Sequence, residues 1–275
     1  MSVAGVSTQA LVLAAALWGA AAGALLPRAA YRFAVPAGEP WRERCAQGHP
    51  IRGWLGRARC GPCAQEAVRE QGATRTGVKA RARVTVRAPE AAKAPYSPST
   101  ALLAVATALA CAALAVATGT RPELGVWLLL APVWVLLAAV DVRVQRLPDP
   151  LTLPLAAAGL GLLALVTLMP EHAGDWLTAL YGALALGGGY LVLFLVNPSG
   201  MGFGDVKLAL GMGAVLGWYG WPTLLLGTFA GFLLGALYGG ALVVARRAGR
   251  KTAIPFGPFL IAGAFAGLLI GAYAA

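Results

Sequence analysis

Charged residues are scarce in this chain of 275 residues. Asp, Glu, Lys and Arg make up 12% of it, whereas apolar residues make up 59%. A soluble domain carries about a quarter charged residues and about half apolar ones. A water-exposed protein of this length has too little interior to bury so many apolar side chains. The composition therefore excludes an ordinary soluble domain and indicates a membrane protein.

Acidic residues are the scarcer kind of charge, with 11 Asp and Glu against 22 Lys and Arg and a formal net charge of +11. In a soluble protein this excess would suggest nucleic acid as a partner. In a membrane protein, basic residues collect in the cytoplasmic loops. Their distribution along this chain follows that rule, so we expect a lipid membrane as partner and no nucleic acid.

Uninterrupted apolar runs predict about eight transmembrane helices, since a helix needs about 20 residues to cross a bilayer. The runs cover residues 9–27, 100–118, 124–140, 151–169, 175–196, 205–219, 221–245 and 254–274. The sixth run is short and rich in glycine, and Gly220 separates it weakly from the seventh. The sequence thus predicts an all-α polytopic membrane protein with a small cytoplasmic insert between its first two helices.

The first apolar run differs from a secretory signal peptide. No Lys or Arg precedes it in residues 1–8, and it is longer than the apolar region of a typical signal peptide. We therefore expect residues 1–27 to hold an uncleaved first transmembrane helix.

Basic residues predict the orientation of these helices. Fourteen of the 22 lie between Arg28 and Lys93, and eight spans place seven others on the same face. These seven are Arg143, Arg146, Lys207, Arg246, Arg247, Arg250 and Lys251. Arg121 alone falls on the opposite face. A different number of helices would distribute the basic residues over both membrane faces. The pattern therefore supports eight spans, with both termini outside and the basic loops in the cytoplasm.

The polar segment after the first helix divides into two parts. Residues 28–70 contain Trp41, Trp54, three cysteines and His49, and we expect a small folded insert there. Residues 71–98 are rich in Ala, Arg, Lys and Pro without apolar periodicity, which predicts a flexible basic linker near anionic lipid headgroups. Residues 99–275 would then form a seven-helix membrane domain.

Eight of the 11 acidic residues lie in polar connections, which leaves Asp141, Asp149 and Asp205. Asp141 ends the third apolar run and Asp205 begins the sixth, so we expect both at the cytoplasmic edge of the hydrocarbon region. Asp149 follows Pro148, where we favour a helix N-cap over a catalytic role. Asp205 could stabilise the N-terminus of its own helix, but Asp141 would face the unfavourable end of a helix dipole.

Two carboxyl groups at one membrane depth suggest acid–base chemistry. Ionisable groups there are costly and are usually paired or line a polar cavity. When two carboxyls lie close together, one can keep a proton while the other activates water, as in aspartic peptidases. Gly202 and Gly204, just before Asp205, allow backbone torsions closed to other residues and close approach of a substrate strand. We therefore interpret Asp141 and Asp205 as an acid–base pair.

The motifs around these aspartates resemble those of the type IV prepilin peptidases, integral-membrane aspartic peptidases of the Gly-x-Gly-Asp type. They are Val140-Asp141, Leu147-Pro148-Asp149-Pro150-Leu151-Thr152-Leu153-Pro154 and Gly202-Phe203-Gly204-Asp205-Val206-Lys207-Leu208. Similarity extends to Tyr31-Arg32, Pro36 and Trp41-Arg42 ahead of the insert's cysteines. The resemblance covers nearly the whole chain.

This resemblance implies a multi-pass protein of the bacterial inner membrane that serves a type IV pilus or a secretion system. Members cleave the short basic leader of prepilins and pilin-like proteins at the cytoplasmic face. The catalytic aspartates of the family match Asp141 and Asp205. The implied substrate-binding and active-site-loop residues are Gly202, Phe203, Gly204, Lys207 and Asp149. Bifunctional members also N-methylate the new terminal residue with S-adenosylmethionine, an activity associated with the insert.

Cysteines are few, and three of the four lie in the insert. Bifunctional relatives typically carry two Cys-x-x-Cys pairs there; here Cys60 and Cys63 form one pair, whereas Cys45 is followed by His49. Cys45, His49, Cys60 and Cys63 make a set that tetrahedral zinc accepts, and a small insert would gain stability from it. The alternative is a reduced cysteine pair with an incidental histidine. Cys111 is interpreted as a packing residue.

A transporter or channel whose aspartates bind cations or protons is the alternative from another class. Its binding residues would lie near the membrane midplane, whereas these acids cluster at one edge. A catalytically silent scaffold for pilus assembly is disfavoured because both aspartates and the glycine loop are present. Basic groups near the proposed site, including Lys207, cannot recruit a leader that is itself basic, so we expect anionic lipid as their partner.

Overall fold

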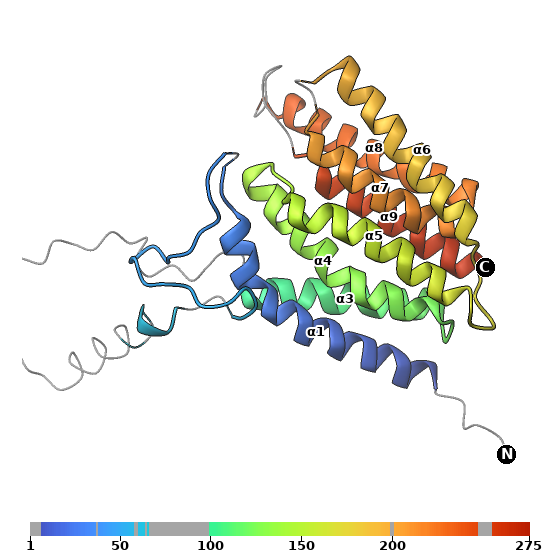
Figure 1. Cartoon of the computed structure of the whole chain (residues 1–275), viewed down its shortest axis with the longest axis horizontal. Helices are drawn as coiled ribbons and strands as arrows, with labels where there is room; N and C mark the ends of the chain where they lie inside the picture. The colour runs from blue at the N-terminus through green and yellow to red at the C-terminus, as the bar shows by residue number, and fades with distance from the viewer. Residues whose placement is uncertain are drawn as a thin grey trace, which may run out of the picture.

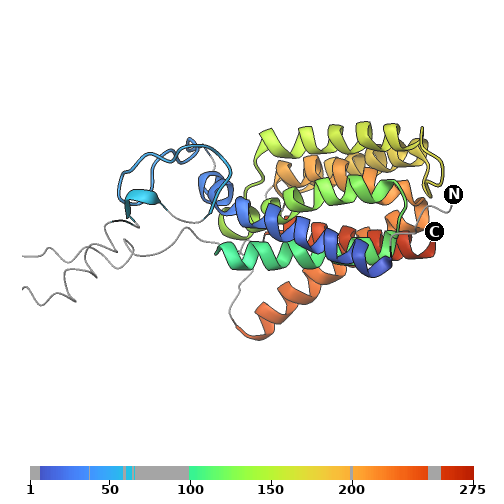
Figure 2. The same cartoon turned by 90° about the horizontal axis from the view of Figure 1, so that it is seen from below.

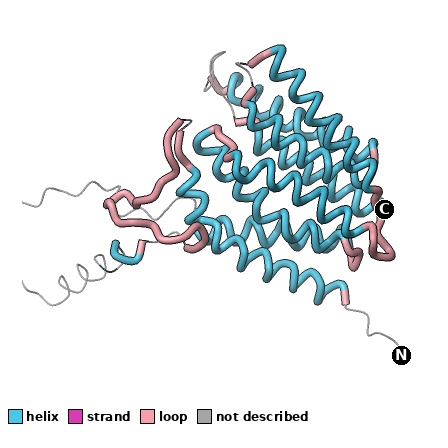
Figure 3. Tube along the Cα trace, viewed as in Figure 1, coloured by secondary structure: helices cyan, strands magenta, loops and turns pink. Residues whose placement is uncertain are grey.

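The computed structural model describes residues 7–36, 38–57, 60–63, 65, 99–198, 201–246 and 255–275. Within these ranges the chain is helical apart from its loops (Figure 3) and an isolated bridge between Arg44 and Pro50. The long helices are α1 (Thr8–Phe33), α3 (Thr100–Thr118), α4 (Glu123–Val144), α5 (Asp149–Val166), α6 (Trp176–Val196), α7 (Phe203–Trp218), α8 (Trp221–Val244) and α9 (Gly257–Ala274). They confirm the predicted all-α polytopic membrane fold.

Consecutive helices run in opposite directions, so the chain forms one antiparallel bundle (Figures 1 and 2). Helix α1 begins and α9 ends at the same end of the bundle, and the insert extends from the opposite end (Figure 1). Helices α4, α6 and α8 end on the side of the bundle that carries the insert. The proposed basic linker, residues 71–98, lies outside the described residues.

Helix α7 is shorter than the other long helices. Seven of the described helices are long and apolar enough to cross a membrane, whereas α7 has only 16 residues. Eleven of these are buried, because α7 packs against α5, α6, α8 and α9. A helix enclosed by protein does not have to match the bilayer thickness by itself. Gly220, with a φ of +93°, separates α7 from α8 and confirms the predicted boundary.

Glycines bring several pairs of helices into backbone contact. A Cβ atom added to Gly213 on α7 would lie 2.3 Å from the carbonyl oxygen of Gly182 on α6. A Cβ atom on Gly263 of α9 would lie 2.2 Å from the backbone nitrogen of Gly231 on α8. Such close approach is typical of membrane helices, which pack through small residues. The frequent glycines thus fix the helix positions at these two interfaces.

Helix α1 extends six residues past its predicted end and anchors the insert. Arg28 in its last turns donates from Nη1 to the carbonyl oxygens of Arg52, at 2.7 Å, and Leu55, at 3.1 Å. The guanidinium of Arg32 stacks on the ring of Trp54, 3.9 Å from its centroid. Two basic residues that the sequence places in a polar loop are therefore helical, and they hold the insert against the bundle.

Candidate active site

Asp141 lies in the last turn of α4 and is only 4% exposed. Gln145 ends this helix in the left-handed conformation, with a φ of 49°, and donates its N–H to the carbonyl oxygen of Asp141 at 2.8 Å. The carboxyl group itself faces the start of α9, where a Cβ atom added to Gly257 would lie 2.7 Å from Oδ2. Oδ2 has no hydrogen bond of ordinary geometry among the described residues, and the backbone N–H of Gly257 acts on the carboxyl group from close by.

Asp205 lies in the first turn of α7 and is 7% exposed. Its Oδ2 accepts a hydrogen bond from the backbone N–H of Gly202 at 3.3 Å, which ties the glycine loop to the helix start. Gly202 has a φ of −77°, so its torsions are open to any residue, contrary to the sequence-based expectation. The constraint at Gly204 is close approach, since an added Cβ atom would lie 3.0 Å from Cβ of Leu147.

The two aspartates come together around Leu147. This side chain, 6% exposed, touches Gly204 beside Asp205 and lies 3.5 Å from where a Cβ atom of Gly257 would be. Gly257 in turn contacts Asp141. The two carboxyl groups are near enough to act on each other electrostatically. Two buried carboxyls from different helices thus share one site at the end of the bundle that carries the insert.

Asp149 and Lys207 form a salt bridge at the rim of this site. Lys207 Nζ lies 2.7 Å from Asp149 Oδ1, and it also lies 5.0 Å from the centroid of the Phe203 ring. The predicted N-cap role of Asp149 is wrong: Pro148 is the N-cap of α5, and Asp149, the first helical residue, makes no capping hydrogen bond. Its side chain is 65% exposed, so it stands apart from the buried pair.

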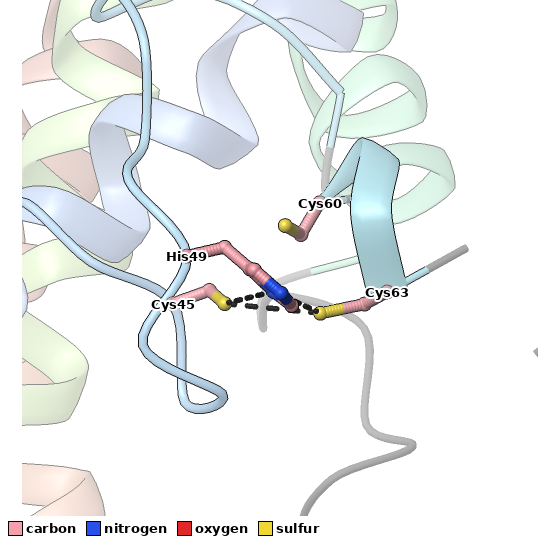
Figure 4. A group of neighbouring side chains, drawn as sticks. All are labelled: Cys45, His49, Cys60 and Cys63. Carbon is pink, nitrogen blue, oxygen red and sulfur yellow. Dashed lines mark hydrogen bonds between the residues drawn. The ribbon is translucent and has the colours of Figure 1, made fainter. Parts of the chain in front are cut away.

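In the insert, Cys45, His49, Cys60 and Cys63 gather into one cluster whose candidate ligand atoms all lie within 4.8 Å of one another (Figure 4). Sγ of Cys45 lies 3.8 Å from Sγ of Cys63, and Nδ1 of His49 lies 3.6 and 3.3 Å from these two atoms. Ligand atoms around a tetrahedral zinc ion stand roughly 3.5 to 3.8 Å apart. The donor set and its spacing therefore fit zinc.

The thiols of this cluster differ in acidity. Burial disfavours the Cys45 thiolate, but hydrogen bonds from the backbone N–H groups of Gln47 and His49 outweigh it and lower the pKa of Cys45 to about 7. Burial raises the pKa of Cys63 to about 12, and the neighbouring sulfur atoms act in the same direction. Thiolates held this close repel each other unless a cation compensates their charge.

Glu123, expected in an exposed connection, is fully buried at the opposite end of the bundle. Arg121 Nε lies 3.7 Å from its Oε1, and the Tyr219 hydroxyl donates to the same oxygen at 3.4 Å. Trp127 donates from Nε1 to that hydroxyl at 3.2 Å. The one basic residue predicted on this face thus has a buried acidic partner, which explains why it departs from the charge pattern.

Sequence reasoning missed two residues that shape the site. Leu147 was recognised only as part of a motif, and Gly257 was not singled out at all. The available signal for Gly257 was its position at the start of the last apolar run, between Phe256 and Pro258. Nothing in the sequence indicates that Leu147 packs against both Gly204 and Gly257, because these contacts join the α4–α5 loop to α7 and α9.

The sequence profile of the type IV leader peptidase family matches residues 128–240, a range that contains both aspartates. The prepilin leader peptidase/N-methyltransferase of Aeromonas salmonicida is 39% identical over 155 residues, which cover 53% of this chain and 50% of the relative. The Escherichia coli protein of the same name is 36% identical over 169 residues, covering 58% of this chain and 68% of the relative.

The leader peptidase HopD of Salmonella typhimurium is 37% identical over 131 residues, covering 46% of this chain and 79% of that protein. The aligned part of this chain spans about half the length of the Aeromonas relatives. No solved structure matches the chain.

Proposed function

Because this chain belongs to the type IV leader peptidase family, we propose that it is a membrane-embedded aspartic endopeptidase for type IV prepilins or pilin-like proteins. The observation that carries the proposal is the buried pair of Asp141 and Asp205, which two antiparallel helices bring to the same end of the bundle. A carboxyl pair of this kind can divide acid and base roles between its members.

In the proposed reaction, one aspartate accepts a proton from water as the water attacks the scissile carbonyl carbon. The other aspartate donates a proton to the departing amine. Leu147, Gly204 and Gly257 pack together and keep the two carboxyl groups at a fixed separation. Such a reaction requires this positioning. The Asp149–Lys207 salt bridge links the starts of α5 and α7 beside the pair.

We propose that the reaction takes place at the cytoplasmic face of the bacterial inner membrane. Arg146 and Lys207 lie in the loops and helix ends beside the aspartates, and the insert with its basic residues extends from the same end (Figure 1). By the positive-inside rule, this end faces the cytoplasm. A prepilin whose basic leader is still in the cytoplasm would meet the site there.

Substitution of either aspartate tests this proposal. We expect Asp141→Asn and Asp205→Asn each to abolish processing of a co-expressed prepilin, because an amide can neither hold nor give the required proton. Immunoblotting of the membrane fraction measures the precursor and the mature form. Glu171→Gln, an exposed carboxyl at the opposite end, is the matched control and should process normally. Full processing by either aspartate variant contradicts the proposal.

We also propose that the insert binds one zinc ion through Cys45, His49, Cys60 and Cys63. His49 supplies the fourth ligand, one residue after Gly48, which stands where bifunctional relatives typically have a cysteine. A bound ion would stabilise a segment that has a small apolar cluster of its own, formed by Cys45 with Tyr31, Ile51 and the other two cysteines. The role of the ion is structural, because all four ligands come from the protein.

N-methylation of the new terminal residue, with S-adenosylmethionine as donor, is the second candidate function. The observation that favours it is the insert, which is folded around four ligand residues despite the altered first cysteine pair. The names of the Aeromonas and Escherichia coli relatives include N-methyltransferase. Mass spectrometry of the mature pilin tests for N-methylation. We expect its N-terminal residue to be 14 Da heavier than the unmodified residue. An unmodified N-terminus contradicts this activity.

A further inference from the structure

Tyr190 is a buried tyrosine on α6 whose hydroxyl group takes no part in the acid–base reaction of the two aspartates. The residue is 2% exposed, and its hydroxyl oxygen has no hydrogen-bond partner among the described residues. The ring packs against Phe232 of α8, at 5.8 Å between centroids, and Phe256 just before α9, at 6.1 Å. The hydroxyl is therefore held firmly while its hydrogen-bonding capacity is unused.

The packing of α6 on α7 brings Tyr190 near the level of Asp205. A Cβ atom on Gly187 would meet the side chain of Leu210, and the rings of Phe194 and Phe203 lie 5.4 Å apart. Since the two helices are antiparallel, these contacts bracket Tyr190 and place it opposite Lys207, two residues along α7 from Asp205. Asp205 acts electrostatically on the tyrosine, which agrees with this register.

Two adjacent residues connect the Tyr190 ring to the Asp141 carboxyl. Phe256, which packs on the Tyr190 ring, is followed directly by Gly257, and Gly257 contacts the Asp141 carboxyl. Oδ2 of Asp141 also has no hydrogen-bond partner among the described residues. Buried polar atoms are nearly always hydrogen-bonded, so both of these atoms are available to a polar ligand that enters the site. A substrate peptide bond and its attacking water are such a ligand.

We propose that Tyr190 is a third catalytic residue, whose hydroxyl group donates a hydrogen bond to the scissile carbonyl oxygen of the bound peptide; this rests on the proposed peptidase function. As the water oxygen bonds to the carbonyl carbon, one water proton passes to the ionised aspartate. The π electron pair moves to the carbonyl oxygen, where the hydrogen bond from Tyr190 stabilises the negative charge. Tyr190 keeps its own proton.

In the second half of the reaction, the electron pair returns to form the carbonyl of the leader's new carboxyl end. The carbon–nitrogen bond breaks, and the other aspartate, which has been protonated from the start, gives its proton to the nitrogen of the mature chain. The hydrogen bond from Tyr190 weakens at this point because the oxygen loses its charge. Its contribution is therefore confined to the charged intermediate and the transition states around it, so its removal should lower kcat with little change in KM.

Tyr190→Phe removes the hydroxyl group and keeps the ring. With a purified type IV prepilin in detergent, we expect kcat to fall about 100-fold, as for loss of other donors to a developing oxyanion. KM and the thermal unfolding midpoint should stay close to those of the wild type, since the hydroxyl makes no hydrogen bond within the described protein. Tyr181→Phe, on the same helix but 53% exposed, is the matched control and should retain wild-type kcat.

The outcomes distinguish failure of the proposed role of Tyr190 from failure of the proposed peptidase function. Wild-type kcat in Tyr190→Phe overturns the role of Tyr190, provided that the wild type cleaves and Asp205→Asn does not. A kcat loss that merely follows a lowered unfolding midpoint overturns it too, because the hydroxyl would then support packing. Replacement of Tyr190 by 4-aminophenylalanine, which restores a donor, should recover part of the lost kcat. A wild type unable to cleave prepilin, or an active Asp205→Asn, refutes the peptidase function itself.

Discussion

Gly257 shows how single residues define the active site. It is the first residue of α9, and its backbone packs directly against the carboxyl of Asp141. On its other side it lies close to Leu147, which also touches Gly204. The φ of Gly257 is not in the left-handed region, so its backbone torsions do not require glycine. Glycine is required there because a side chain would collide with the Asp141 carboxyl. The separation of the two aspartates therefore depends on a residue without a side chain.

Gly257→Ala tests this dependence. The added Cβ atom would lie 2.7 Å from Oδ2 and 3.2 Å from Cγ of Asp141, so the carboxyl has to move. We expect the rate of prepilin cleavage to fall about 100-fold, as for a misplacement of about 1 Å at a reacting group. Overpacking of this kind should also lower the free energy of unfolding by about 1–3 kcal/mol. Cleavage kinetics and thermal unfolding in detergent measure the two effects.

The control for this variant is Gly188→Ala on α6. A Cβ atom there meets nothing within 4 Å, and alanine favours a helix interior over glycine by up to about 1 kcal/mol. Cleavage should be normal and stability unchanged or higher. If Gly257→Ala cleaves prepilin as fast as the control, the contact with Asp141 does not position the carboxyl.

Some of these residues could be chosen from the sequence and others could not. Asp141 and Asp205 could be chosen because acids are so few that those outside polar loops are conspicuous. The salt bridge between Asp149 and Lys207, the burial of Glu123 and the contacts of Leu147 could not. Each depends on how side chains from different helices meet, and apolar periodicity carries no information about that.

At the scale of elements, the insert is the part that hydropathy describes least. Its described residues contain an isolated bridge and a short helical turn that carries Cys63, and they depend on Arg28 and Arg32 of α1 for anchorage. Arg146, after α4, donates to the carbonyl oxygen of Pro36 at 2.7 Å and adds a second attachment. A segment with so little core of its own should depend on the proposed zinc ion for its stability.

Removal of metal tests the role of the cluster. We expect the purified protein to contain about one zinc ion per chain by elemental analysis. A chelator strong enough to remove it should expose the insert to proteolysis and lower its thermal stability, because the binding energy of such an ion contributes to folding. Zinc added back should reverse both changes. Unchanged proteolysis and unfolding after complete removal of zinc would reject a structural role for the ion.

Substitutions at cysteines give the matched comparison. Cys63→Ser should lose the zinc ion, since it removes one of four ligands. Cys111→Ala, in the middle of α3 and distant from the insert in the fold, should keep it. Zinc content that stays the same in Cys63→Ser would show that the four residues do not form the site.

The helices themselves could be predicted closely, and the differences have physical causes. Each of the eight apolar runs is a helix, because a long apolar segment in a membrane must satisfy its own backbone. The predicted end of α1 was too early because Arg28 and Arg32 were interpreted as loop residues, although their side chains reach the insert from within the helix. The predicted N-cap at Asp149 was one residue too late, because α5 begins with the aspartate itself.

At the scale of the whole molecule, the antiparallel bundle collects the chemistry at one end. Asp141 lies in the last turn of α4, Asp149 and Lys207 lie in the first turns of α5 and α7, and Tyr190 lies in the second half of α6. These parts of the helices face the end of the bundle that carries the insert (Figure 1). The far end holds the Arg121–Glu123 pair, which we interpret as structural. This division agrees with the asymmetry of basic residues along the chain.

The central claim is that Asp141 and Asp205 together hydrolyse the leader peptide of a prepilin. The most direct measurement is the intact mass of a purified prepilin after incubation with purified enzyme in detergent. With the wild type, we expect the mass of the mature chain and a separate leader peptide. With Asp141→Asn or Asp205→Asn, each folded as judged by thermal unfolding, the precursor mass should persist. Mature product from either variant at the wild-type rate would contradict the account.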